Sequence, residues 1–90
     1  MFSSGYASSL TTGTISDGIY FIIIQESIST TNRSKPSFGV IYINGGNAWI
    51  NVPSSTDSKL SSITCNSGSL TITLSASRYI TVTLFNTMTS

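Results

Sequence analysis

Apolar and polar residues alternate with a period of two along most of this chain of 90 residues. The pattern is clearest in residues 69–75 and 78–85, where Leu, Ile and Val alternate with Ser and Thr. Such alternation is typical of half-buried strands in an antiparallel sheet. No segment predicts a helix. Four shorter segments are also expected to be strands: a possible edge strand at 10–15, and the segments 37–43, 48–52 and 60–65. Together with residues 18–25, 69–75 and 78–85 they make six or seven strands.

Residues 18–25 differ from the other expected strands because they are apolar on both sides. This pattern indicates a central strand, covered on both faces. The sequence leaves open which side faces the core, since either Ile19 or Tyr20 could begin the inward series.

The turn sequence NGGN predicts a tight hairpin, because type I′ turns favour Asn and Gly at positive φ. A turn at Gly45–Gly46 pairs Ile43 with Ala48 and Ile41 with Ile50. All four side chains then share one face, so the loop length agrees with the apolar pattern.

A second hairpin is expected at Ser67–Gly68, which pairs Ile63 with Ile72 on one face. The last two strands, 69–75 and 78–85, are expected to be joined by a short loop with a bulge around residues 75–78. Together these elements predict an all-β fold: an antiparallel β-sandwich or flattened barrel of six to eight strands with meander hairpins.

We expect residues 1–13 to form a flexible or fibre-like lead and residues 14–90 to form a single β-sandwich domain. The expected core is made of inward-facing apolar side chains: Ile19 or Tyr20, Ile22, Ile24, Ile41, Ile43, Ile50, Val52, Ile63, Leu70, Ile72, Leu74, Ile80, Val82 and Leu84.

Charged residues are scarce, at 8% of the chain, whereas about 25% is usual in soluble proteins. The net charge of +1 excludes the strongly basic surface of a nucleic-acid-binding protein. The first ten residues lack a signal peptide's basic and apolar segments, and the longest apolar run, 19–24, is too short to span a membrane. We therefore expect no signal peptide and no membrane segment.

The chain has no His and one Cys, Cys65, which excludes a His-dependent catalytic triad, a His–Cys metal site and an internal disulfide. The only carboxylates are Asp17, Glu26 and Asp57. We interpret them as one turn residue and two solvated charges, because nothing pairs them for acid–base chemistry. The chain is thus expected to be a non-enzyme without a metal or cofactor.

The Gly45–Gly46 hairpin directs five side chains to the face opposite the core: Tyr42, Asn44, Asn47, Trp49 and Asn51. Tyr42 and Trp49 should lie directly opposite each other, with the three Asn residues around them. An aromatic platform next to amides suits a sugar ring, whose apolar side stacks while its hydroxyls bond to the amides. The alternative is that the aromatic pair packs in a contact between subunits or under a loop.

Four segments carry a resemblance to a known class of protein: SDGIYFIII (16–24), SFGVIYINGGNAWINV (37–52), SLTITLS (69–75) and RYITVTLFNT (78–87). In this layout the chain resembles the small all-β modules at the C-terminal ends of bacteriophage tail-fibre and other virion appendage proteins. The resemblance implies a virion location, a homo-oligomer, commonly a trimer, and contact with a host-surface polysaccharide or protein. It supplies no catalytic residues.

Two functions follow from these observations. The first is a non-enzymatic virion module that binds a host-surface glycan through Trp49 and Tyr42. The second is a purely structural trimerisation, cap or capsid-decoration module, in which Trp49 is buried between chains. Apolar surface on both sides of residues 18–25 favours oligomerisation in either case.

Overall fold

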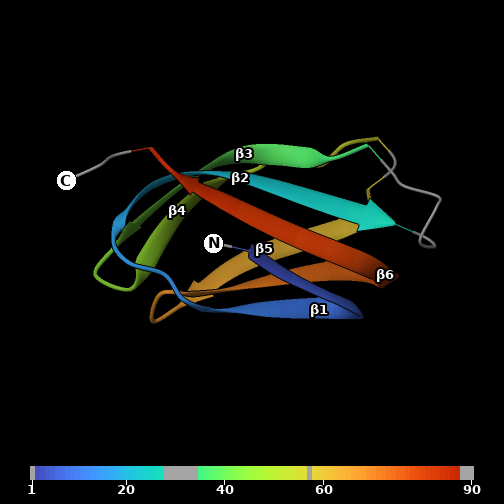
Figure 1. Cartoon of the computed structure of the whole chain (residues 1–90), viewed down its shortest axis with the longest axis horizontal. Coiled ribbons are helices and arrows are strands. Elements are labelled where there is room, and N and C mark those ends of the chain that lie inside the picture. The colour runs from blue at the N-terminus through green and yellow to red at the C-terminus, as the bar shows by residue number, and fades with distance from the viewer. Residues whose placement is uncertain (1, 28–34, 57, 88–90) are drawn as a thin grey trace.

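The structure, a computed structural model, describes residues 2–27, 35–56 and 58–87. These residues form antiparallel β-strands and no helix, which confirms the all-β class (Figure 1). No membrane-spanning helix occurs in this part of the chain. The strands are β1 (Phe2–Thr14), β2 (Gly18–Ser27), β3 (Ser37–Asn44), β4 (Asn47–Asn51), β5 (Leu60–Asn66) and β6 (Ser69–Asn86).

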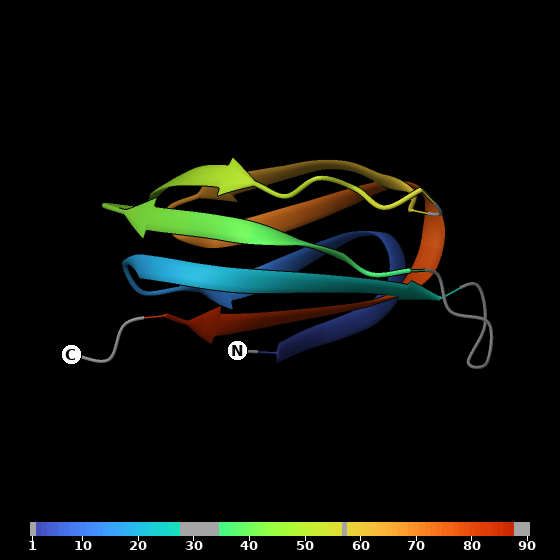
Figure 2. The ribbon, with the colours of Figure 1, turned by 90° about the horizontal axis from the view of Figure 1, so that it is seen from above.

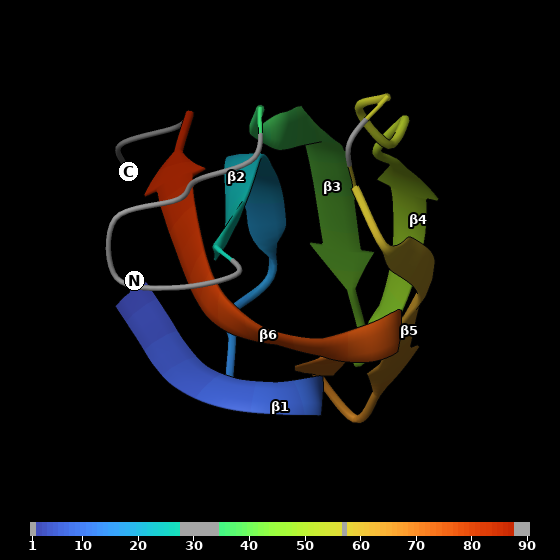
Figure 3. The same cartoon turned by 90° about the vertical axis from the view of Figure 1, so that its right-hand side faces the viewer.

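One curled sheet contains all six strands, in the order β1-β6-β2-β3-β4, with β5 also paired to β6. The first part of β6 pairs with β5 and its second part with β2, so β6 belongs to both halves of the sheet. Viewed end-on, β6 and β1 bend together round the molecule, while β4 and β5 approach each other at the open side (Figure 3). The result is a half-barrel, consistent with the predicted sandwich or flattened barrel.

Strand β6 is continuous where the sequence predicted two strands joined by a loop at residues 75–78, so the loop was wrong. The irregularity expected there is present, because the pairing of β6 with β1 shifts register between Thr73 and Arg78. Leu74 and Ile80 are six residues apart, an even number, so an uninterrupted strand places both on the inner face. The intervening residues, Ser-Ala-Ser-Arg-Tyr, contain no Gly, Pro or Asn that would favour a turn. The chain therefore bends there without reversing.

Residues 2–14, most of the expected N-terminal lead, form β1 and pair with β6 from Phe2↔Thr83 to Thr14↔Ser69. The strand is anchored on its inner side. Leu10 packs against the core, and the buried Thr12 Oγ1 accepts a hydrogen bond from the Leu70 backbone N–H at 3.0 Å. Ser and Thr make up most of the rest of β1, which lies at an edge of the sheet order.

Both predicted hairpins have the expected registers, with Ile43↔Ala48 in one and Ile63↔Ile72 in the other. Gly45 and Gly46 have φ values of 62° and 82°, the positive values that a type I′ turn requires at both central positions. The apolar pattern and the turn chemistry therefore agree in both hairpins.

The core lies inside the curl, and the side of β2 that faces it is the one carrying Tyr20, Ile22 and Ile24. Of the other predicted core residues, Ile50, Val52 and Ile63 are only half-buried, because they lie beside the gap between β4 and β5. The buried apolar side chains are Ile15, Tyr20, Ile22, Ile24, Ile41, Ile43, Leu70, Ile72, Leu74, Ile80, Val82 and Leu84.

Glu26, expected to be a solvated charge, is instead buried with 1% of its surface exposed. Its carboxylate accepts hydrogen bonds from the Ser58 hydroxyl and from the Lys59 backbone N–H, the latter at 2.8 Å. Glu26 therefore ties the segment between β4 and β5 to the end of β2. A buried carboxylate is tolerated when such donors surround it.

Candidate binding face

The predicted aromatic pair lies on the outer side of the half-barrel. Tyr42 of β3 is directly opposite Trp49 of β4, as expected from the hairpin register. Both side chains are exposed. Their positions follow from the alternation of each strand, since Ile41 and Ile43 on either side of Tyr42 face the core.

The three predicted Asn residues accompany this pair. Asn44 and Asn47 are opposite each other next to the β3–β4 turn, and Asn51 ends β4. All three are exposed. The turn itself is held by Asp17, whose Oδ1 accepts a hydrogen bond from the Gly45 backbone N–H at 3.1 Å. The structure thus brings all five predicted residues to one corner of one face.

This corner is part of a wider apolar surface, which we call the aromatic face. Figure 2 looks onto the outer side of the sheet, where β6, β2, β3 and β4 lie side by side. The face is defined by large hydrophobic side chains that are each 38–68% exposed: Ile19, Phe21, Ile23, Phe38, Tyr42, Trp49 and Phe85.

The strand registers arrange these side chains in rows across neighbouring strands. Side chains in the same row belong to directly paired residues, and successive rows are two residues apart along each strand. Phe21 of β2 is at the centre of the grid. The rows are Trp49–Tyr42–Ile19, Val40–Phe21–Phe85 and Phe38–Ile23–Thr83.

No charged residue occupies an outward position of β2, β3, β4 or the 79–86 part of β6. Farther along the same side, Tyr6 of β1 meets Tyr79 of β6, with ring centroids 4.7 Å apart and an angle of 54° between the planes. Polar groups on the aromatic face are thus limited to hydroxyls and amides, chiefly at its margins.

Sequence reasoning missed Phe21, Phe38 and Phe85 as members of this face. Phe38 has the same parity as Tyr42 along β3, so the sequence did contain a signal for it. Phe85 has the opposite parity to the buried Leu84, but its position beside Phe21 depends on the pairing of β2 with β6. That long-range pairing is not evident from local alternation.

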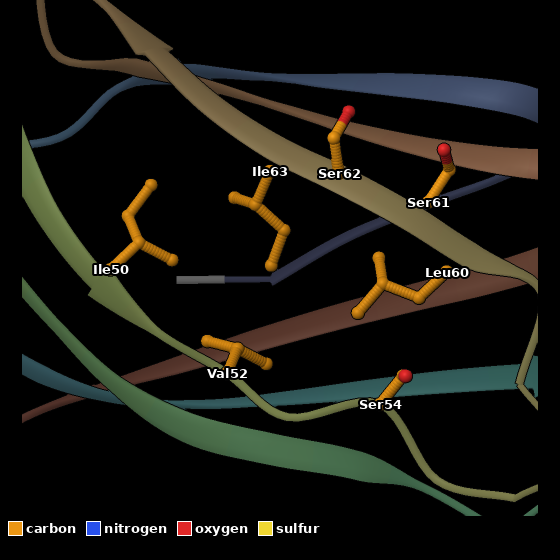
Figure 4. Close-up of a pocket in the computed structure, with 7 residues that line it drawn as sticks. All are labelled: Ile50, Val52, Ser54, Leu60, Ser61, Ser62 and Ile63. Atoms are coloured by element: carbon orange, nitrogen blue, oxygen red, sulfur yellow. The ribbon is translucent and has the colours of Figure 1, made fainter.

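The gap between β4 and β5 contains a separate pocket of about 180 Å³ (Figure 4). Four apolar side chains surround it, and three serines complete its lining. It has no titratable group, so it offers apolar contact and hydrogen bonds but no acid or base. The lining residues are Ile50, Val52, Ser54, Leu60, Ser61, Ser62 and Ile63.

The carboxylates and the thiol of the described residues belong neither to the aromatic face nor to the pocket lining. The Asp17 and Glu26 carboxylates are engaged by backbone and hydroxyl donors, and Asp57 lies outside the described residues. Cys65 is half-buried, with its thiol 3.4 Å from the Gly46 carbonyl oxygen. No group of three or more His, Cys, Asp or Glu side chains able to hold a metal ion occurs in the described ranges.

What the aromatic face offers chemically is a broad, uncharged apolar surface held by backbone hydrogen bonds of four adjacent strands. Such a surface binds by excluding water and contributes little directional bonding. Comparisons with protein families, with curated proteins and with solved structures found no match.

Proposed function

We propose that this chain is a non-enzymatic structural module of a larger protein assembly, joined to it through the aromatic face. The observation that carries the proposal is the size of that face. With 38–68% of each side chain exposed, its seven residues present on the order of 700 Å² of apolar surface. The largest apolar patch on a typical monomer is about 300–600 Å² and is often functional.

The composition of the face supports a protein as its partner. The buried centres of protein interfaces are depleted in charge and enriched in aromatic residues. Phe21, Val40 and Phe85 form the middle row of the face, and none of them can hydrogen-bond through its side chain. A sugar bound over these three side chains would find a hydrogen-bonding amide only at the end of the row, where Asn51 of β4 pairs with Val40.

The resemblance of the strand segments to virion appendage modules supports an appendage or other virion surface as the setting. The same resemblance is the basis for expecting a homo-oligomer, with a trimer as the preferred number, and contact with a host surface. These remain proposals that rest on analogy.

The double substitution Phe21→Thr with Phe38→Thr tests this function. Threonine suits exposed strand positions, so the variant should fold while losing two large rings of the face. Sedimentation velocity from micromolar to millimolar concentration should show association of the natural chain and none for the variant. Tyr6→Thr, which removes an exposed ring outside the aromatic face, should associate like the natural chain.

Two results would contradict the proposal. One is association that persists undiminished in the Phe21→Thr, Phe38→Thr variant. The other is a natural chain that sediments at 9.5 kDa over the whole concentration range.

A second candidate function, glycan binding, is favoured by the corner around Trp49. This ring belongs to β4, which pairs with β3 alone in the sheet order, so a sugar can reach it from above and from the open side. The exposed amides of Asn44, Asn47 and Asn51 supply donors and acceptors nearby. Sugar binding here would use the corner only and would leave the Phe21 region exposed.

Trp49 is the only tryptophan, so its fluorescence reports on this corner directly. Under glycan binding, adding a purified bacterial cell-surface polysaccharide should shift its emission, and Trp49→Ala should abolish attachment without changing the sedimenting mass. The expected loss is about 1–3 kcal/mol of stacking, by analogy with bases stacked on aromatic rings. Blue-shifted emission that resists acrylamide and moves to the red only on dissociation would instead support the structural function.

A further inference from the structure

We infer that the aromatic face packs against the same face of a second copy of this chain, round a two-fold axis close to Phe21. The inference rests on the proposed function and names the partner of that surface. It is carried by three properties of the face: its area, its lack of charge and its arrangement about a central residue.

The area matches what a stable pair of subunits needs. A standard protein interface buries about 800 Å² on each partner. The seven apolar side chains supply on the order of 700 Å². The exposed Asn44 and Asn51, together with Thr83, lie at the margin and add polar rim of the usual kind.

A face with no charge can meet its own copy without repulsion. No outward position of the four strands that form the face carries a charged side chain. A like-charge contact across a two-fold interface would cost several kcal/mol, and none arises from these positions.

The grid is suited to self-packing because its centre is Phe21. On β2, Ile19 and Ile23 lie on either side of Phe21, and Val40 and Phe85 are its partners on the neighbouring strands. Two sheets that pack face to face lie about 10 Å apart with side chains interdigitated. A two-fold axis near Phe21 then places this ring beside its own copy.

A two-fold arrangement uses the face completely, since one partner sheet covers all three rows. In the three-fold arrangement that the resemblance alone would favour, each face is divided between two neighbours, so the outer positions Trp49 and Phe38 would be covered less well. Isologous two-fold pairs are also the commonest homo-oligomers. Burial of this face would add to the small core that a chain of 90 residues can build.

Sedimentation equilibrium tests the stoichiometry and the surface together. The natural chain should have twice the mass of 9.5 kDa. Phe21→Thr should weaken the pair at least about 30-fold, as loss of a central aromatic anchor does. Tyr6→Thr should leave the dissociation constant unchanged.

Cross-linking tests the geometry without removing any ring. In a Cys65→Ser background, Val40→Cys places one thiol next to Phe21. A bismaleimide long enough to span the about 10 Å between packed sheets should join two copies at this position. The control, Thr64→Cys, carries a more exposed strand thiol on β5, outside the aromatic face, and should remain uncross-linked.

Each outcome decides for or against the pair. Association through the aromatic face with three copies per particle would overturn the two-fold arrangement and leave the proposed function standing. Cross-linking at Thr64→Cys but not at Val40→Cys would show that the copies meet through another surface and would overturn both. A single-chain mass at millimolar concentration would also overturn both.

Discussion

Strand β2 has two apolar sides with opposite surroundings. On the inner side, Tyr20, Ile22 and Ile24 are 7%, 0% and 0% exposed. On the outer side, Ile19, Phe21 and Ile23 are 38%, 56% and 38% exposed. The side chains are of similar hydrophobicity, so composition alone does not explain the difference.

Topology explains it. The bend of β6 brings residues 69–74 and β5 over the inner side of the sheet, and their apolar side chains close the core. Nothing in the described residues covers the outer side of Phe21. The inner side is therefore completed by the chain itself, and the outer side is left exposed.

Replacing one isoleucine on each side of β2 should give the largest contrast. Ile22→Ala should lower the free energy of unfolding by about 2–5 kcal/mol, because it leaves a cavity in the core. Ile23→Ala should lower it by about 0.5 kcal/mol or less when measured on the dissociated chain. Urea unfolding followed by far-ultraviolet circular dichroism measures both. Equal losses would mean that the outer side is covered within the single chain.

Local patterns were sufficient to predict the two hairpins. Alternation fixed the faces of β3, β4 and β5, and Gly at positive φ fixed the turns, so Ile41↔Ile50 and Cys65↔Leu70 could be assigned from sequence. The continuity of β6 could also have been inferred, because Leu74 and Ile80 have the same parity. Of strand β1 only the end was anticipated, as the possible edge strand at 10–15, since its Ser- and Thr-rich first part lacks alternation.

The candidate site was predicted only where it is local. Tyr42 and Trp49 belong to one hairpin, so their pairing follows from the turn. The extension of the face to Phe85 depends on β2 pairing with β6, and these strands lie at opposite ends of the chain. The parity of residues 18–25 was undecided for the same reason, since only the packing of distant strands distinguishes the sides.

The buried carboxylate of Glu26 is the polar exception on the inner side of β2, and it is satisfied within the chain. Glu26→Ala should lower the unfolding free energy by about 1.5–3 kcal/mol, because the Ser58 hydroxyl and Lys59 N–H lose a charged acceptor. Asp17→Ala is the matched control, since it removes an exposed carboxylate with one backbone hydrogen bond and should cost less. Urea unfolding compares the two. An equal cost would show that Glu26 is not buried in solution.

Residues beside the gap between β4 and β5 should have an effect on stability that is intermediate between those of the buried and the exposed side of β2. Ile63 points toward the core but lies beside the pocket, and it is only half-buried. Ile63→Ala should therefore cost about 1 kcal/mol, less than the about 2–5 kcal/mol expected for its fully buried partner Ile72→Ala. The same unfolding assay measures this. Equal losses at the two positions would indicate that β4 and β5 close the gap in solution.

The smallest expected effect is the coupling energy between Tyr6 and Tyr79, one of two aromatic pairs on the outer side of the sheet. Tyr6 and Tyr79 contact each other within one chain, whereas Tyr42 and Trp49 belong to the aromatic face that we assign to a partner. A double-mutant cycle with Tyr6→Ala and Tyr79→Ala should give a coupling energy of about 0.5–1 kcal/mol, at the lower end for aromatic pairs because both rings are exposed. The coupling should be independent of protein concentration, since both rings lie outside the proposed interface. A coupling that grows with concentration would extend the interface to β1, and the two-fold axis would then lie closer to Tyr79 than to Phe21.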